Sequence, residues 1–205
     1  MDSKREYRTL PLTELRAAES DGKKVIEGHA AVFDSWSETL GGFFPFKEKV
    51  RAGAFAKSIG TDDIRALFNH DANHVLGRNK AGTLDLAEDG AGLFVRIYPP
   101  DTQWARDLQT SIARGDITQM SFGFIVEKDE WSSQDGADTR ELVEVKLFDV
   151  SPVTFPAYTQ TDVGVRAHER YKAEARQRAE NEVKAALDAK ERLRQRNRLT
   201  KLKIM

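Results

Sequence analysis

Apolar and polar residues alternate along several short stretches of the chain, which is the period of a strand with one buried face. The clearest stretches are residues 117–126 and 142–150, followed by residues 25–33. Two more, residues 83–86 and 92–98, are joined by a Glu-Asp-Gly turn that favours a hairpin. With the shorter runs between them, the patterns predict about seven strands, mostly antiparallel.

Two short segments have the spacing and the ends of helices. Residues 52–60 are rich in alanine and end on a glycine, and residues 103–114 repeat apolar side chains at helical spacing before Gly115. Pro152 and Pro156 cannot donate ladder hydrogen bonds, so we expect the last strand to end before them. The fold class is therefore mainly β with flanking helices (α+β), arranged as an antiparallel β-barrel of about seven strands.

The composition changes near residue 166. Residues 166–203 contain neither glycine nor proline and are rich in Ala, Glu, Lys and Arg, which predicts one long helix. Residues 166–205 carry 13 basic and 6 acidic side chains, net +7, whereas residues 1–165 carry 19 and 27, net −8. We therefore expect a folded domain over 1–165 and a basic helical tail over 166–205, which docks on an acidic partner or is removed.

The composition also excludes several kinds of protein. Because the chain has no cysteine, it has no disulfide, thiolate zinc site, iron–sulfur cluster or thiol nucleophile. No apolar run approaches the ~18 residues of a membrane span, and the first residues lack an apolar signal core, so we expect a cytoplasmic protein with no membrane partner. The tail has one aromatic residue, Tyr171, which disfavours a nucleic-acid partner.

Three polar residues in or beside predicted strands could act together. Ser121 lies inside an apolar strand, His70 follows a strand in the triplet Asn-His-Asp, and Glu144 lies in the next strand after Ser121. A serine needs a base to take its proton, and a histidine acts as that base when a carboxylate fixes its tautomer. A serine, a histidine and a carboxylate on one sheet would supply all three roles.

A metal site is the competing hypothesis for the same region. His70 and His74 have the spacing of two ligands on one helical face, which would suit a metal-dependent hydrolase. The intervening Asp-Ala-Asn is poor helix material. We therefore expect neither a metal nor a cofactor.

Six sequence blocks, spread from about residue 25 to residue 160, carry a family resemblance. They are GHAAVFD (28–34), RAGAFAKS (51–58), LFNHD (67–71), GLF (92–94), GDITQMSFGF (115–124) and LFDVSPVTFPA (147–157). Together and in this order they resemble the prohead maturation proteases of tailed bacteriophages, which are related in fold to herpesvirus assemblin.

The resemblance implies roles for individual residues. It implies an assemblin-like barrel with Ser121 as the nucleophile and His70 as the general base. Assemblins place a second histidine in the strand after the nucleophile, and aligning that strand puts Glu144 at the equivalent position. Asp149 is the alternative third member, and strand alternation puts it on the opposite face from Glu144. We prefer Glu144 and keep Asp149 as the alternative.

The resemblance also implies a function and its partners. The chain would be a serine endopeptidase that cleaves the major capsid protein, its scaffolding segment and itself through an acyl-enzyme. It would act inside the assembling procapsid in the bacterial host cytoplasm, and the assemblin relationship suggests a homodimer. The alternative is a catalytically idle capsid-assembly or scaffolding factor with the same fold, which would be free to lose the serine, the histidine and the carboxylate.

Overall fold

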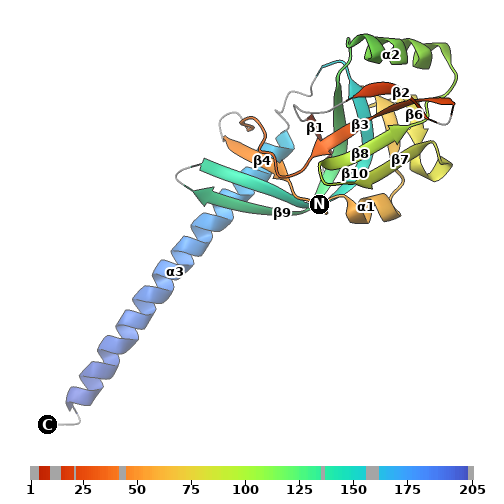
Figure 1. Cartoon of the computed structure of the whole chain (residues 1–205). Coiled ribbons are helices and arrows are strands. Elements are labelled where there is room, and N and C mark those ends of the chain that lie inside the picture. Colours follow the sequence, from red (N-terminus) through yellow and green to blue (C-terminus); the bar gives the residue numbers. More distant parts are fainter. Residues whose placement is uncertain are drawn as a thin grey trace. The chain divides into compact units, whose positions relative to one another are not determined.

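The computed structural model describes residues 5–9, 15–20, 22–41, 45–134, 137–155 and 162–202, in two compact units over residues 1–165 and 166–205 (Figure 1). The strands described in the first unit are β1 (Glu6–Thr9), β2 (Arg16–Ser20), β3 (Lys23–Val32), β4 (Phe46–Val50), β5 (Arg65–Phe68), β6 (Asp71–Arg78), β7 (Leu84–Glu88), β8 (Gly92–Ile97), β9 (Gln119–Gln134) and β10 (Ala137–Val153). The helices are α1 (Ala56–Thr61), the 3-10 turn η1 (Asn79–Ala81), α2 (Gln103–Arg114) and α3 (Asp162–Leu202).

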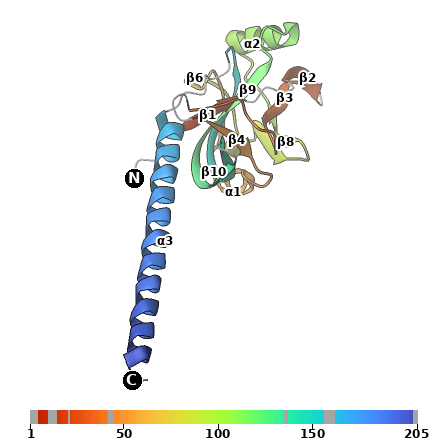
Figure 2. The same cartoon turned by 90° about the vertical axis from the view of Figure 1, so that its left-hand side faces the viewer.

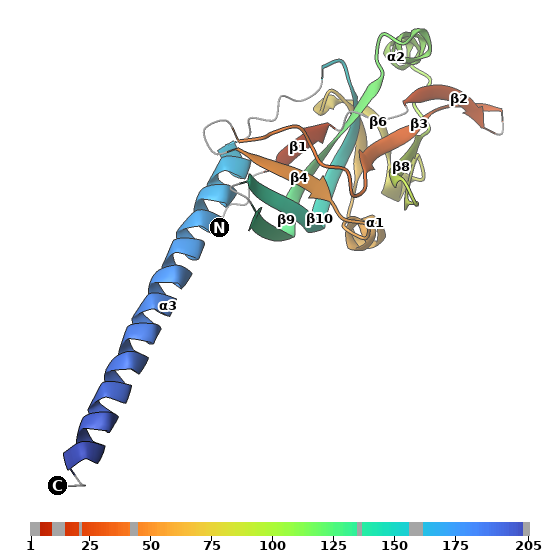
Figure 3. The same cartoon turned by 60° about the vertical axis from the view of Figure 1, so that its left-hand side comes forward.

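The strands form two sheets. The six-stranded sheet has the order β1-β9-β10-β5-β6, with β4 also paired to β10, and the four-stranded sheet has the order β2-β3-β8-β7. The hairpin of β9 and β10 is the longest pairing in the described chain. Its two strands lie side by side in all three views of the first unit (Figure 1, Figure 2, Figure 3). The same views place α2 and α1 at opposite ends of this unit.

The predicted mainly β class with flanking helices is confirmed, whereas the closed antiparallel barrel is not. The described strands number ten and belong to two open sheets, which an isolated bridge between Phe33 and Val50 links. In addition, β4 and β5 run parallel to β10. The strands β4 and β5 pair with different stretches of β10, residues 138–142 and 149–150, and α1 lies between β4 and β5 in the chain. Alternation within single strands does not reveal which strands pair or in which direction.

The core of the first unit lies between the two sheets and under α1 and α2. Its buried apolar side chains include Phe122 of β9, Leu147 of β10, Ile26 of β3 and Val95 of β8, with Ile112 of α2 in the same cluster. In β8 and β9 alternate residues face the core, which is the pattern that made these strands visible in the sequence. Polar residues of β9 and β10 are left on the other face.

The hairpin of β9 and β10 is longer than predicted. The two predicted strand stretches end at residue 126 and begin at residue 142, but the polar segment between them continues both strands, as far as Gln134 and from Ala137 onward. Polar cross-strand pairs hold it: the hydroxyls of Ser132 and Thr139 are 2.6 Å apart, and Arg140 Nε donates to Asp129 at 2.8 Å. Strand patterning by hydrophobicity misses a ribbon held in this way.

Pro152 lies inside β10, so the expectation that the strand ends before it is wrong. Pro152 pairs with Met120 of β9, and its carbonyl accepts the backbone N–H of Asn69 at 3.0 Å. The N and C=O of one residue point to the same side of a strand, so the missing N–H also faces the Asn69 turn. On that side, the pairing of β10 with β5 ends at Val150, before Pro152. The missing N–H of Pro152 therefore costs no ladder hydrogen bond.

The second unit consists of one long helix. The predicted helix over 166–203 is confirmed by α3, which spans Asp162–Leu202. The large apolar side chains Val183 and Leu187 are exposed on it. Among the described residues, none of the helices has the length and apolar character needed to span a membrane.

Gly92 supplies a prediction about stability. A Cβ at Gly92 would lie inside the van der Waals radius of the Ala31 carbonyl on the neighbouring strand β3, whereas a Cβ at Gly90 would meet nothing within 4 Å. We expect Gly92→Ala to lower the free energy of unfolding by about 2–3 kcal/mol, because backbone must move to relieve the overlap. Urea denaturation followed by circular dichroism measures this, with Gly90→Ala as the matched control at under about 0.5 kcal/mol. Equal losses for both variants would contradict the packing argument.

Candidate active site

Ser121 is held on the face of β9 opposite the core. Met120 and Phe122 on either side of it are buried in apolar surroundings, so the alternation of the strand turns Ser121 and Gly123 to the other face. Ser121 itself is 0% exposed. Its neighbours in the sequence therefore fix its direction, and something other than the core covers it.

A bulge in β10 brings Asp149 to the same face as Ser121. Val145 and Leu147 belong to the core, and strict alternation would put Asp149 there too. The register shifts between Leu147 and Asp149, after which Val150 is the core residue. Asp149 then pairs opposite Gly123.

Gly123 makes room for that carboxylate. A Cβ at this position would overlap Asp149 Oδ2 and would lie 2.9 Å from Tyr7 Cε1. A side chain at position 123 would therefore push Asp149 away. The glycine in the Met-Ser-Phe-Gly-Phe block is therefore required because no side chain fits between β9 and the Asp149 carboxylate.

His70 reaches the site from the tight turn between β5 and β6. The two turn residues, Asn69 and His70, have φ values of 53° and 58°, in the left-handed region that Asn and His tolerate better than most residues. Asn69 ties the turn to the end of β10: its Oδ1 accepts the backbone N–H of Thr154 at 2.9 Å, and its own N–H is held by Pro152. The turn therefore holds the imidazole against β9 and β10.

The imidazole of His70 bridges the serine and the aspartate. Its Nε2 lies 2.7 Å from Ser121 Oγ, and its Nδ1 lies 2.5 Å from Asp149 Oδ1. Asp149 Oδ1 also accepts the hydroxyl of Ser151 at 2.9 Å. An acceptor at Nδ1 favours the tautomer with its proton there, which leaves the Nε2 lone pair directed at the serine. The group has the geometry to remove a proton from Ser121.

Strand β1 covers this group, and sequence analysis missed it. Ser121 Oγ donates to the carbonyl of Arg8 at 2.9 Å, and the Tyr7 ring centroid is 4.3 Å from that of His70. Just before β1, the Arg5 guanidinium lies 3.9 Å from Asp149 Oδ2, a buried oxygen that accepts no hydrogen bond. The segment Arg-Glu-Tyr-Arg-Thr carries no apolar alternation, so no strand pattern could have revealed it.

Glu144, the preferred third member, does not contact His70, whereas Asp149, the alternative, does. The Glu144 carboxylate is paired with Lys57 of α1 at the partly exposed edge of β10. The hydrogen bond and charge of Glu144 raise the pKa of Lys57. The run of bulges in β10 changes which residues face His70, and an alignment by strand position does not take such bulges into account.

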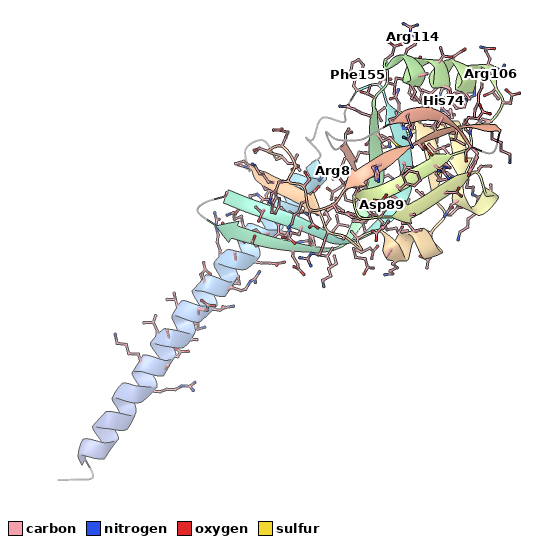
Figure 4. The ribbon with its side chains drawn as sticks, in the orientation of Figure 1. Arg8, His74, Asp89, Arg106, Arg114 and Phe155 are labelled. Atoms are coloured by element: carbon pink, nitrogen blue, oxygen red, sulfur yellow. The ribbon has the colours of Figure 1, made fainter. Side chains whose placement is uncertain are left out.

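His74 also lies apart from His70. It belongs to β6 rather than to a helix; its Nδ1 is 2.8 Å from Asp71 Oδ2, and its ring meets that of Trp104 on α2 edge-on (Figure 4). The pKa of Asp71 is lowered, most by the hydrogen bond from the backbone N–H of Asn73 and next by the hydrogen bond from the His74 ring. The helical face assumed for a His70–His74 metal site is therefore not formed. No three His, Asp or Glu side chains in the described chain gather as metal ligands.

Comparison with known proteins agrees with the family resemblance. The sequence profile of the Caudovirus prohead serine proteases matches residues 12–176. The chain is 30% identical over 148 residues to the prohead protease of Enterobacteria phage HK97, and this alignment covers 70% of the chain and 60% of the relative. The chain thus spans about 60% of that relative's length, and no solved structure matches it significantly.

The resemblance read from the six sequence blocks is confirmed by both matches. The profile match contains the turn of His70 and the strands of Ser121 and Asp149. The chain therefore belongs to the family of Caudovirus prohead serine proteases.

Proposed function

We propose that this chain is a serine endopeptidase in which Ser121 is the nucleophile, His70 the general base and Asp149 the third member. The observation that carries the proposal is the bridge of His70 between the other two, at 2.7 Å and 2.5 Å. Family membership supports the same activity. The proposal replaces Glu144 with the alternative that was kept open.

The proposed reaction proceeds through an acyl-enzyme. His70 Nε2 takes the hydroxyl proton as Ser121 Oγ attacks the scissile carbonyl, and the resulting imidazolium then protonates the leaving amine. A water molecule, activated by His70 in the same way, releases the acyl group and restores the serine. Asp149 holds the Nδ1 proton and stabilises the imidazolium, and the Ser151 hydroxyl keeps the carboxylate oriented.

The proposed substrates are the proteins of an assembling capsid. The HK97 relative is named for the prohead, and on that ground we propose the major capsid protein and its scaffolding segment as substrates, cleaved inside the procapsid in the host cytoplasm. The charge of the tail, net +7, suits docking on an acidic segment of such a partner. A homodimer stays a prediction.

The first prediction about catalysis concerns the nucleophile and the base. Ser121→Ala and His70→Ala should each lower cleavage by about five to six orders of magnitude, because each removes a group without which the proton transfer and the attack cannot be coupled. Cleavage of co-expressed capsid protein, mapped by mass spectrometry of new termini, measures the loss. Circular dichroism should match the wild type, and EDTA should leave the wild-type rate unchanged.

Residual cleavage near the wild-type rate in purified Ser121→Ala would contradict the nucleophile assignment. A wild-type chain that cleaves nothing but still enters capsids would favour the idle assembly factor. Inhibition by EDTA would instead support the metal-dependent hydrolase.

The second prediction separates the two carboxylates. Asp149→Asn should lower turnover by about four orders of magnitude, as the equivalent change does in another triad enzyme, because the amide favours the wrong tautomer of the histidine. Glu144→Gln should change the rate by less than about fivefold, since it breaks a partly exposed ion pair with Lys57. Single-turnover rates on one peptide compare them, and the reverse ranking would restore Glu144.

The third prediction is that the wild-type chain shortens itself. The connector around residues 159–161 lies outside the described residues, and in the sequence it is a polar stretch between a folded domain and a helix, the kind of segment that proteases cut. Purified wild-type protein should lose the segment after about residue 160, whereas Ser121→Ala stays at full length. Intact mass spectrometry over time tests this, and equal shortening of both chains would assign the cut to another protease.

A further inference from the structure

The short strand β1 and the residue before it occupy the space in which a substrate would have to react. Three groups contact the three proposed site residues: the Arg8 carbonyl holds the Ser121 hydroxyl, the Tyr7 ring covers His70, and Arg5 lies beside Asp149. A scissile carbonyl must come within about 3–3.5 Å of the attacking oxygen. Since Ser121 is 0% exposed, β1 has to move before any peptide can react.

The Arg8 carbonyl also competes with His70 for the serine proton. A hydroxyl has one hydrogen, and Ser121 Oγ lies 2.9 Å from the Arg8 carbonyl and 2.7 Å from His70 Nε2, two acceptors that cannot both receive it. While that hydrogen is donated to Arg8, the imidazole cannot accept it. Displacement of β1 would free the hydroxyl for His70.

The position of β1 suits replacement by another strand. It has four residues, lies at the end of the six-stranded sheet and pairs antiparallel with β9, with Thr9 opposite Ser121 (Figure 3). If β1 leaves, the edge of β9 presents unpaired backbone N–H and C=O groups beside the nucleophile. Such an edge binds an extended peptide by main-chain hydrogen bonds, and pockets for alternate side chains add specificity.

One of those pockets is acidic and buried. Arg8 lies on the opposite face of β1 from Tyr7, which contacts His70, and its Nε and Nη2 donate to the two carboxylate oxygens of Glu48 at 2.7 Å and 3.2 Å. Arg8 and Glu48 are each 3% exposed. This forked contact suits a guanidinium better than the point charge of a lysine.

The partners of Glu48 indicate what the vacated pocket would take. With β1 gone, Glu6 and Arg8 leave together, and Arg140 remains with Glu48 at 3.0 Å and Asp129 at 2.8 Å. The net charge of the cluster is unchanged, but Glu48 loses both hydrogen bonds from the Arg8 guanidinium. A buried carboxylate that loses its donors is strongly unfavourable, so the pocket selects a peptide that brings a positively charged donor to Glu48.

We propose that β1 is a built-in occupant of the substrate site, and that an extended peptide with arginine at the position of Arg8 displaces it, with Glu48 as the specificity-determining residue. The inference rests on the proposed protease function and adds to it a substrate class and a latent state. Lysine would be accepted more weakly, and glutamine or glutamate would be rejected.

The first test measures binding without cleavage on the full chain carrying Ser121→Ala. The probes are labelled, blocked peptides Arg-Glu-Tyr-X-Thr, in which X is Arg, Lys, Gln or Glu. The expected order is Arg, then Lys, then Gln and Glu, with at least about tenfold between Arg and Gln in fluorescence anisotropy. Adding Glu48→Gln should remove that preference. The matched control is Glu27→Gln, which alters a buried carboxylate paired with two arginines in the other sheet and should leave the order intact.

The second test asks whether the peptide displaces β1. Hydrogen exchange of the same full chain should show faster exchange of the amides of residues 6–9 when the Arg peptide is bound, while the amides of β10 keep their protection. Because β1 competes at the millimolar effective concentration of a tethered segment, the peptide should bind at least about tenfold tighter after Arg8→Gln. Arg16→Gln, which loosens an arginine on Glu27, is the control. The proposal is overturned if the peptide binds while residues 6–9 stay protected, or if its affinity does not depend on residue X. It is also overturned if millimolar peptide does not bind to the Arg8→Gln chain.

A serine-directed fluorophosphonate separates this proposal from the protease assignment. We expect Ser121 to be labelled slowly in the otherwise unaltered chain and at least about tenfold faster after Arg8→Gln. Labelling at equal rates would overturn the covering role of β1 and leave the nucleophile in place. Displacement of β1 by the Arg peptide without labelling of Ser121 in either chain would refute the protease and keep the peptide site.

Discussion

The antiparallel pairing of β9 with β10 is the constraint on which the site depends. Ser151 lies opposite Ser121 and Asp149 lies opposite Gly123, so two pairs of one ladder, with a single core pair between them, supply the proposed nucleophile, the carboxylate and the hydroxyl that orients it. Both strands bury one face in the core, β9 with regular alternation and β10 with bulges, and this burial prevents a slip of register. Only the histidine comes from elsewhere, and its turn is fastened to the end of the same strand β10.

Part of this arrangement could be predicted from the sequence. Ser121 lies in a strongly apolar strand, and His70 lies in a turn-forming triplet directly after a second predicted strand. Both residues therefore stood out in the sequence, because packing does not explain a polar residue at either position. The structure brings them within 2.7 Å of each other. The long helix after residue 162 was predictable for a different reason, because its composition alone excludes the alternatives.

Other parts could not be predicted because they depend on departures from regular alternation. Asp149 reaches the site through a bulge, and a bulge leaves no mark in the hydrophobic pattern. Strand β1 and the far half of the hairpin are held by polar and charged pairs, such as Arg8 with Glu48 and Arg140 with Asp129. Hydrophobic periodicity is insensitive to both. The parallel pairing of β4 and β5 with β10 depends on the path of the chain, and it decides between two open sheets and a barrel.

The buried charges beside β1 also have a structural consequence that does not depend on their contribution to stability. Ion pairs taken out of water gain little over apolar packing, because desolvation offsets their attraction. What they supply here is register: Glu6 and Arg8 are the residues of β1 that face Arg140 and Glu48, and a shift of β1 by one residue would place Tyr7 there instead. That same register sets the Arg8 carbonyl on the Ser121 hydroxyl. A strand placed by charge rather than by apolar burial is fixed accurately while it is bound, yet a peptide that carries the same charge pattern can replace it.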